Sequence, residues 1–332
     1  MIKKLKYYIL SYSIIFLIGA FIGEGVLRYK GIQPLGSDQP AIKVSPGDRY
    51  FKTDSVLGYH HLAGKFEVTL KETYQFTTTH NEAGLRITAP LEAEKDSLPQ
   101  IWIMGCSFTH GWSVNDDETY PWLVQKELPA YNVVNFGMNG LGTIHALLQL
   151  ERALKTGNLP KKVVLAYAGF HKERNTFSNA RRRAVARWNF LGSLTQPYAR
   201  IENDELVIKK ADKVEYRSWW LAEQSSLISF IQAKVDGIKD KKIDQTAITD
   251  QLLLKIKTLT DQHNIELIIA NIWMDGETEI ANFCKKNQIT FTNIAVDLSK
   301  YGRTNMPYDG HPSAKTHQMY ANELTDFLKK AL

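Results

Sequence analysis

The sequence has few cysteines and little excess charge of either sign. Cys106 and Cys284 are the only cysteines among 332 residues, too few for a disulfide framework or a cysteine-ligated zinc site. The formal net charge is +6, and residues 1–30 account for +4 of it. A nucleic-acid-binding protein carries a basic footprint on its folded part. Because the remainder of this chain is nearly neutral, we exclude nucleic acid as a partner.

The sequence also lacks internal repeats and low-complexity tracts. Hydrophobic residues make up 44% of the chain and charged residues 23%, which is typical of a globular protein and excludes a disordered or collagen-like chain. About 300 residues suit one large α/β domain with additions, or two small domains.

One long uncharged run stands at the N-terminus. Lys6 and Glu24 bracket the 17 residues 7–23, YYILSYSIIFLIGAFIG. As a helix this run is about 25 Å long, near the lower limit for spanning a bilayer. The three preceding lysines predict a cytoplasmic start and an exported remainder. A poor cleavage site favours an uncleaved anchor, while a cleaved signal peptide and a buried core helix stay open as alternatives.

The segment after this run is expected to be a linker followed by short strands. Residues 31–50 are rich in Pro, Gly, Ser and Asp and are typical of a linker. Residues 51–97 contain alternating runs, such as those at 66–70 and 74–77, which predict a small β-rich segment.

From residue 100 the chain alternates between apolar strands and helices, which predicts a parallel sheet. Strands are expected at 101–104, 131–136, 162–168, 265–272 and 289–291, and helices at 118–128, 144–155, 277–286 and 314–332. Residues 176–245 interrupt the alternation. We interpret them as a largely helical insertion with a hairpin around residues 202–204.

A serine follows the first of these strands. In Gly105-Cys106-Ser107, Ser107 lies where a parallel sheet presents ligand-binding groups. At a helix N-terminus it is either a nucleophile, if a base reaches it, or an ordinary helix cap.

A carboxylate and a histidine lie together near the other end of the chain. Asp309 and His311 precede the last helix, and a carboxylate can fix the tautomer of a neighbouring histidine. The alternative is a turn at Asp309-Gly310 beside a surface histidine.

Four stretches together resemble the conserved blocks of the SGNH/GDSL hydrolase superfamily: GCSFTHGWSVNDDETYPWLVQKEL, VVNFGMNGLGT, VVLAYAGFHKERN and DGHPSAKTH. The resemblance covers roughly residues 98–330, and the preceding segment resembles the lead-in of membrane-anchored bacterial members. It implies a flavodoxin-like three-layer fold, a parallel sheet flanked by helices. It also implies a triad of Ser107, Asp309 and His311, with backbone N–H groups of Ser107 and Gly140 in the oxyanion hole.

The sequence departs from the family pattern at three places. Cys106 replaces a frequent aspartate, only Gly310 separates Asp309 from His311, and the third block lacks its oxyanion asparagine. His171 is the nearest polar replacement, and we predict that it donates to the oxyanion, with Asn175 as the fallback.

The resemblance implies acyl transfer without a cofactor or metal. We expect an extracytoplasmic serine esterase that removes acyl groups, with O-acetyl expected, from carbohydrate or a small ester. An O-acyltransferase and an inactive glycan- or protein-binding scaffold are the alternatives. The expected organisation is a membrane anchor at 1–30, a linker and β-rich segment at 31–97, and the hydrolase-like domain at 98–332, with the insertion at 176–245.

Other candidate residues favour structural interpretations. His60, His61 and His80 could suggest a metal but are expected at the surface, and His317 is expected to face outward from the last helix. Trp112 could line the acyl pocket or belong to the core. In the insertion, packing is preferred to sugar stacking for Trp188, Trp219 and Trp220, and a solvated helix face is preferred to anion binding for the basic run Arg181, Arg182, Arg183 and Arg187.

Overall fold

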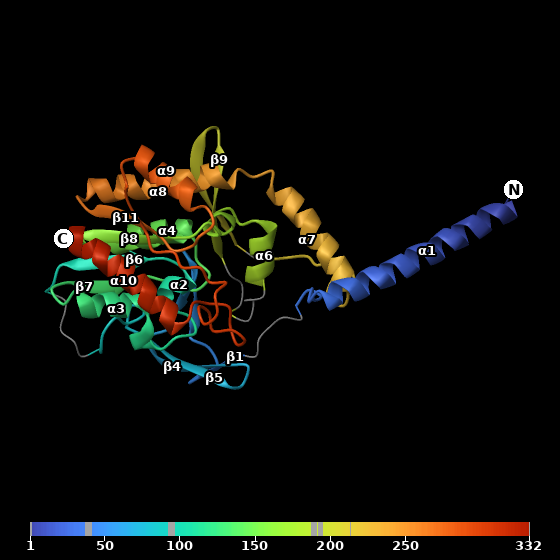
Figure 1. The fold of residues 1–332 in the computed structure, drawn as a ribbon. Helices are drawn as coiled ribbons and strands as arrows, with labels where there is room; N and C mark the ends of the chain where they lie inside the picture. Colours follow the sequence, from blue (N-terminus) through green and yellow to red (C-terminus); the bar gives the residue numbers. More distant parts are fainter. Residues whose placement is uncertain are drawn as a thin grey trace. The chain divides into compact units, whose positions relative to one another are not determined.

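The computed structural model describes residues 2–36, 42–91, 97–186, 191, 195–212 and 214–331 (Figure 1). The chain divides into two compact units. The first combines residues 1–40 with residues 215–243, and the second combines residues 41–214 with residues 244–332. Residues 215–243, which the sequence analysis places in an insertion, therefore belong to the same unit as the N-terminal helix.

The first unit consists of two helices joined by a polar cap. They are α1 (Ile2–Tyr29) and α7 (Ser226–Asp240). The Glu24 carboxylate accepts hydrogen bonds from the first two amides of α7, at 3.0 and 2.8 Å. Arg28 pairs with Glu24 at 2.6 Å and donates to the Gln224 carbonyl at 2.8 Å. Because a carboxylate is stabilised at a helix N-terminus, the last turns of α1 hold the start of α7.

The N-terminal helix has the properties of a membrane span. Its stretch Lys4–Tyr29 is long and apolar enough to cross a membrane, and a signal sequence has the same properties.

The second unit is built on a parallel sheet. Within the described residues, its five strands lie in the order β12-β11-β8-β6-β7, and every neighbouring pair is parallel. The strands are β6 (Gln100–Met104), β7 (Asn132–Asn135), β8 (Lys162–Tyr167), β11 (Glu266–Asn271) and β12 (Thr290–Asn293). Numbered along the chain, this is the flavodoxin-like order 2-1-3-4-5. The predicted fold class is confirmed.

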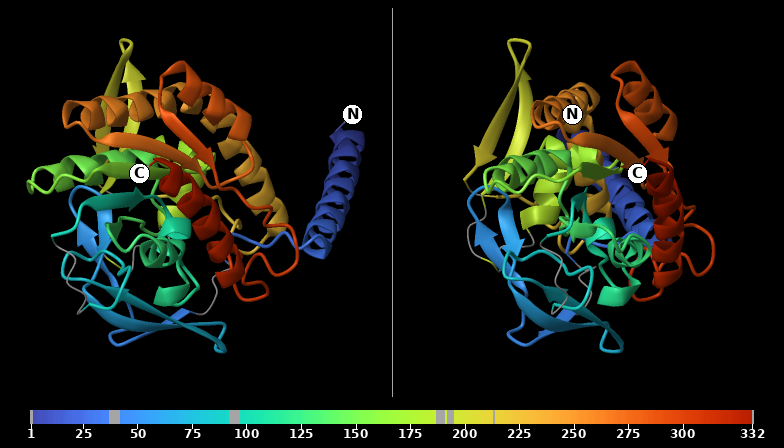
Figure 2. Two further views of the ribbon diagram at one scale, coloured as in Figure 1. Left: turned by 60° about the vertical axis from the view of Figure 1, so that its left-hand side comes forward. Right: turned by 90° about the vertical axis from the view of Figure 1, so that its left-hand side faces the viewer.

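Helices cover the sheet, and α3 (Tyr120–Glu127) packs against α10 (Ala314–Ala331) (Figure 2). Buried side chains of β6, such as Ile101 and Ile103, form one apolar core with Leu324 and Leu328 of α10. The helices α4 (Thr143–Leu154), α5 (His171–Asn175) and α8 (Gln245–Gln262) pack against one another, and α9 (Glu277–Lys286) precedes β12. The sequence analysis did not predict α8.

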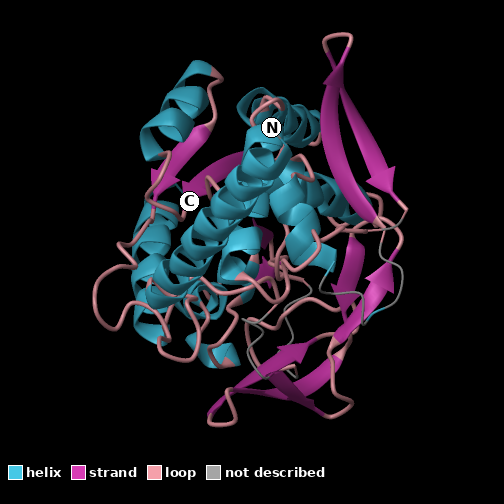
Figure 3. Ribbon diagram, turned by 90° about the vertical axis from the view of Figure 1, so that its right-hand side faces the viewer, coloured by secondary structure: helices cyan, strands magenta, loops and turns pink. Residues whose placement is uncertain are grey.

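Antiparallel strands precede the parallel sheet in the sequence. Figure 3 shows the strands in magenta. Strands β1 (Ile42–Ser45), β4 (Gly64–Leu70) and β5 (Tyr74–His80) form one sheet, and β2 (Phe51–Asp54) pairs with β3 (Gly58–His61). The predicted β-rich segment is therefore present. The prediction that residues 31–50 are only a linker is wrong at residues 42–45, because Ile42–Ser45 pair with Glu67–Leu70 of β4.

Among its described residues, the insertion contains a hairpin and two helices, α6 and the already described α7. Helix α6 (Asn179–Ala186) is followed by β9 (Gln196–Glu202) and β10 (Glu205–Ala211), which pair around a turn at Asn203-Asp204. The hairpin lies where the sequence predicts it.

Candidate active site

Ser107 lies at the carboxyl end of β6. It is the first residue of the short helix α2 (Ser107–His110), after Cys106 in extended conformation, and Gly111 ends the helix in the left-handed region at φ 85°. The chain reverses its strand order between β6 and β8, and ligands bind in such sheets at this switch point, outside the carboxyl ends of the strands. Ser107 therefore occupies the place where this fold presents a reactive group.

His311 joins Ser107 to Asp309. The His311 Nε2 lies 3.0 Å from the Ser107 Oγ, and the His311 Nδ1 lies 2.6 Å from the Asp309 Oδ1. If Nδ1–H donates to the carboxylate, Nε2 keeps its lone pair and faces the serine hydroxyl. The structure thus brings Ser107 to the pair Asp309 and His311, which lies about 200 residues further along the sequence.

The short spacing between Asp309 and His311 determines how the carboxylate is held. The same Asp309 Oδ1 accepts the backbone N–H of His311 at 2.7 Å, while Trp112 donates its indole N–H to the Oδ2 at 3.1 Å. Burial raises the pKa of Asp309, but hydrogen bonds from the His311 ring, the His311 backbone N–H and Trp112 lower it, and the net pKa lies below its usual value. The carboxylate is therefore ionised at neutral pH.

Two further residues near this carboxylate are absent from the sequence analysis. The Ser113 hydroxyl lies 3.4 Å from the Asp309 Oδ1, and the Asn305 amide donates to both the carbonyl and the hydroxyl of Ser113 at 2.8 Å. The sequence analysis gives Trp112 only as a pocket or core residue. Its hydrogen bond to Asp309 could have been anticipated, because a buried indole N–H usually finds an acceptor.

The amides of Ser107 and Gly140, the expected backbone donors of the oxyanion hole, are available to a ligand in the described structure. Within the described part of the chain, no bond has the Ser107 or Gly140 amide as its donor. Gly140 has φ +72°, and a Cβ there would lie 2.7 Å from the Tyr59 hydroxyl. Both the positive φ and this close approach explain why the position holds glycine.

His171 lies at the carboxyl end of β8, and its ring is buried. It packs edge-on against Tyr167 and Phe170, and neither ring nitrogen has a hydrogen-bond partner among the described residues. Burial lowers the pKa of His171, followed by the charge of Arg174, so the ring is neutral and keeps one N–H to donate. Among the described residues, no hydrogen bond or ring contact joins this ring to Ser107 or His311, and the oxyanion role of His171 stays a prediction.

The fallback donor Asn175 is occupied elsewhere. Its Oδ1 accepts the Ile144 amide at 3.0 Å, and its Nδ2 donates to Thr249 at 3.0 Å. This side chain ties α4, α5 and α8 together.

Aromatic rings pack beside the triad histidine. The Phe108 ring lies 5.6 Å from the His311 ring, 5.7 Å from the Phe170 ring and 5.9 Å from the Trp273 ring. These rings give the surroundings of Ser107 an apolar wall.

Several histidines expected at the surface are buried. His60 is 8% exposed, His61 0%, His80 1% and His317 0%, so these expectations are wrong. The physical reason for the first two is that β3 is covered on both faces. His317 turns inward on α10, where its ring stacks on Tyr120 at 6.0 Å.

The structure tests the expected environments of several insertion residues. Trp219 is 42% exposed and Trp220 86% exposed, so neither is packed in the core, while packing at an interface stays a prediction. Arg181 is 8% exposed, and its Nε and Nη2 have no hydrogen-bond partner among the described residues, which contradicts a solvated position. Arg187 and Trp188 lie outside the described residues.

Comparisons with known proteins found matches only among solved structures. No family model matches the sequence, and no curated protein matches it significantly. Solved structures do match with probability 1.00.

The chain is similar to solved lipolytic proteins of the G-D-S-L family. A G-D-S-L family member from Veillonella parvula matches with 11% identity and a TM-score of 0.41, covering 70% of this chain and 98% of its own. TesA matches with 12% identity and a TM-score of 0.41, covering 70% of this chain and 99% of its own.

Proposed function

We propose that the chain is a serine esterase that cleaves ester-linked acyl groups through an acyl-enzyme. The observation that carries this proposal is the continuous hydrogen-bonded chain from Ser107 through His311 to Asp309. A serine hydroxyl is scarcely ionised at neutral pH and needs an adjacent base, which in turn needs an orienting group. The arrangement of Ser107, His311 and Asp309 supports these three roles.

The reaction proceeds by two acyl transfers. The Ser107 Oγ attacks the ester carbonyl carbon, and the His311 Nε2 takes the hydroxyl proton. The carbonyl electron pair moves onto oxygen and returns as the C–O bond to the alcohol breaks, while His311 gives its proton to the leaving alkoxide. Water then attacks the acyl-serine with His311 again as base, which releases the acid and restores Ser107. Asp309 holds the ring and stabilises its cationic form.

The amides of Ser107 and Gly140 are the proposed donors to the oxyanion, with His171 as the third. Removing one such donor typically costs about 3–4 kcal/mol of barrier. The free amide of Ser107 at the start of α2 supports the assignment of the backbone donors.

The proposed substrate is a small acyl ester, with O-acetylated carbohydrate outside the cytoplasm as the natural class. The aromatic rings packed around His311 support a small acyl group. Three basic residues precede the apolar run of α1, which supports export of the remainder. Because Glu24 and Arg28 contact α7 and the adjoining Gln224, the end of α1 belongs to a folded unit, which supports an anchor that is retained.

The experiment is acetate release by full-length protein in detergent, from a small aryl acetate and from O-acetylated polysaccharide. Ser107→Ala is the matched control. We expect hydrolysis by wild type only. Absence of turnover on every ester would contradict the proposal, and preferred transfer to an added sugar hydroxyl would make the chain an O-acyltransferase. For the location, a periplasmic reporter after Leu332 should be active, and activity only of a cytoplasmic reporter would contradict export.

A further inference from the structure

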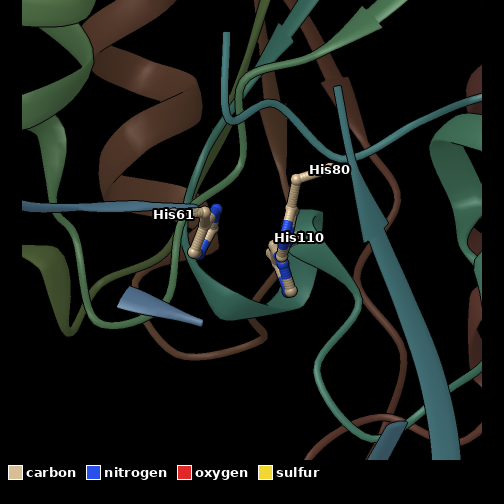
Figure 4. A group of neighbouring side chains, drawn as sticks. All are labelled: His61, His80 and His110. Carbon is tan, nitrogen blue, oxygen red and sulfur yellow. The ribbon is translucent and has the colours of Figure 1, made fainter. Parts of the chain in front are cut away.

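Three buried histidines from separate segments meet behind the nucleophile helix. His61 ends β3, His80 ends β5, and His110 ends α2, three residues after Ser107 (Figure 4). One ring nitrogen from each lies within 4.8 Å of the other two. All three are at most 1% exposed. The sequence shows them only as isolated histidines, because fold contacts alone bring them together.

Hydrogen bonds among these rings leave nitrogen atoms unused. The His80 and His110 Nε2 atoms lie 3.0 Å apart, and the His61 Nε2 lies 3.2 Å from the Asn139 Oδ1. The Nδ1 atoms of all three rings have no hydrogen-bond partner among the described residues. A neutral imidazole has one donor and one acceptor nitrogen. If His61 donates to Asn139, its Nδ1 therefore carries a lone pair with no hydrogen-bond partner among the described residues.

We infer that His61, His80 and His110 form a binding site for one divalent transition-metal ion of the zinc class. Imidazole nitrogen is a preferred ligand of zinc, copper and nickel. Zn–N distances of about 2.0–2.1 Å place two nitrogens of a tetrahedral site about 3.3 Å apart, close to the spacing of the His80 and His110 Nε2 atoms. Asn139 would orient His61 from the outer side, as partners of metal-bound histidines do.

Ring rotation must complete the site. The His61 and His80 rings are nearly parallel, with 14° between their planes and 4.3 Å between their centroids. Both lone pairs can point at one ion only after one ring turns. Rotation about the Cβ–Cγ bond achieves this without moving the strands.

Arg86 is a cation whose charge acts on all three rings of the cluster. Its charge is balanced by Asp116 at 2.9 Å, and its other nitrogens donate to backbone carbonyls.

The closed position indicates a structural ion rather than a catalytic one. A catalytic zinc keeps a position open to substrate or water. This cluster is fully buried, and Tyr50 packs on the His61 and His80 rings at 5.6 and 5.4 Å. The Tyr50 hydroxyl is buried and has no hydrogen-bond partner among the described residues. That hydroxyl is the candidate fourth ligand. The ion would tie the two antiparallel sheets to the helix that carries Ser107.

The test is metal content of the full-length protein in detergent, purified without a polyhistidine tag. The chain is stripped with a chelator, supplied with equimolar Zn²⁺ and desalted. We expect about one zinc per chain, and a melting temperature about 3 °C or more higher than without metal. Replacement with Co²⁺ should give the visible absorption of a tetrahedral nitrogen-ligated ion.

The variants His61→Gln, His80→Gln and His110→Gln should each retain less than about a tenth of the zinc, and His317→Gln, at a buried histidine outside the cluster, should retain all of it. If the cluster variants do not fold, the cobalt spectrum and the melting-temperature shift of the wild type test whether the protein binds the metal ion. Less than about a tenth of an equivalent of zinc, cobalt, nickel or copper on the wild type, with no melting shift, would overturn the inference. Full zinc retention by the three cluster variants would overturn it as well.

Discussion

His317 should make the fold sensitive to acid. Burial, followed by the charges of Arg86 and His311, lowers its pKa from 6.5 to about 3. In the unfolded chain the ring is protonated below pH 6.5, while in the folded chain it stays neutral to about pH 3. The unfolded state therefore binds one more proton between these values, and stability falls as the pH falls. At 1.36 kcal/mol per pKa unit, this residue destabilises the fold by about 2 kcal/mol between pH 7 and pH 5.

The variant His317→Gln removes this proton-binding difference. The His317 Nδ1 accepts the Tyr120 amide at 3.2 Å, and a glutamine oxygen can accept the same bond. At pH 7 the variant should be less stable than wild type because its packing is poorer. At pH 5 the difference should move in favour of the variant by about 2 kcal/mol.

The assay is denaturant unfolding of the full chain in detergent at pH 7, 6 and 5, followed by tryptophan fluorescence. Gln318→Ala, an exposed change on the same helix, should follow the wild-type pH dependence. Parallel pH profiles for wild type and His317→Gln would refute the claim that His317 is buried in its neutral form.

Three further predictions concern the proposed active site. Ser107→Ala and His311→Ala should each lower kcat for an acetyl ester by several orders of magnitude, and the double variant should be little worse than either, since triad members act as a unit; additive losses would contradict a shared mechanism. Trp112→Phe removes the indole N–H that donates a hydrogen bond to Asp309. It should lower kcat about tenfold with KM unchanged, because a hydrogen bond to a charged group contributes about 1.5–3 kcal/mol. An unchanged kcat would show that this bond does not position Asp309. His171→Ala should lower kcat about 10²–10³-fold, with partial recovery in His171→Asn, and a loss below about threefold would remove His171 from the oxyanion hole.

The sheet was predictable because its strands are short apolar runs between helices. The four-residue strand Ile42–Ser45 was not, because turn-forming residues surround it and its pairing with β4 is a long-range contact. The helix Gln245–Gln262 escaped prediction because polar residues such as Thr246, Thr249 and Thr260 interrupt its apolar stripe. The cap that Glu24 provides to α7 joins residues about 200 positions apart and leaves no local pattern.

Ser107 and the Asp309–His311 pair were predictable because strand ends and loop motifs are local features. Their mutual distance followed only from the resemblance, since spacing of about 200 residues carries no geometry. The burial of His61 and His80 was not predictable, because a histidine in an alternating strand looks like a solvent-facing residue. Whether it faces solvent depends on what covers the strand. All four residues of β3 are buried, and so are the last three residues of β5.

Labelling with a fluorophosphonate tests the triad most directly, because this electrophile reacts fastest with a serine hydroxyl that an adjacent base activates. The full-length protein, its Ser107→Ala variant and its His311→Gln variant are treated in parallel, and the modified peptide is identified by mass spectrometry. The wild type should be labelled at Ser107 with the loss of fluoride, Ser107→Ala should stay unlabelled, and His311→Gln should react at least about 10²-fold more slowly. Labelling at another serine, or equal rates for wild type and His311→Gln, would contradict the assignment of Ser107 as a nucleophile activated by His311.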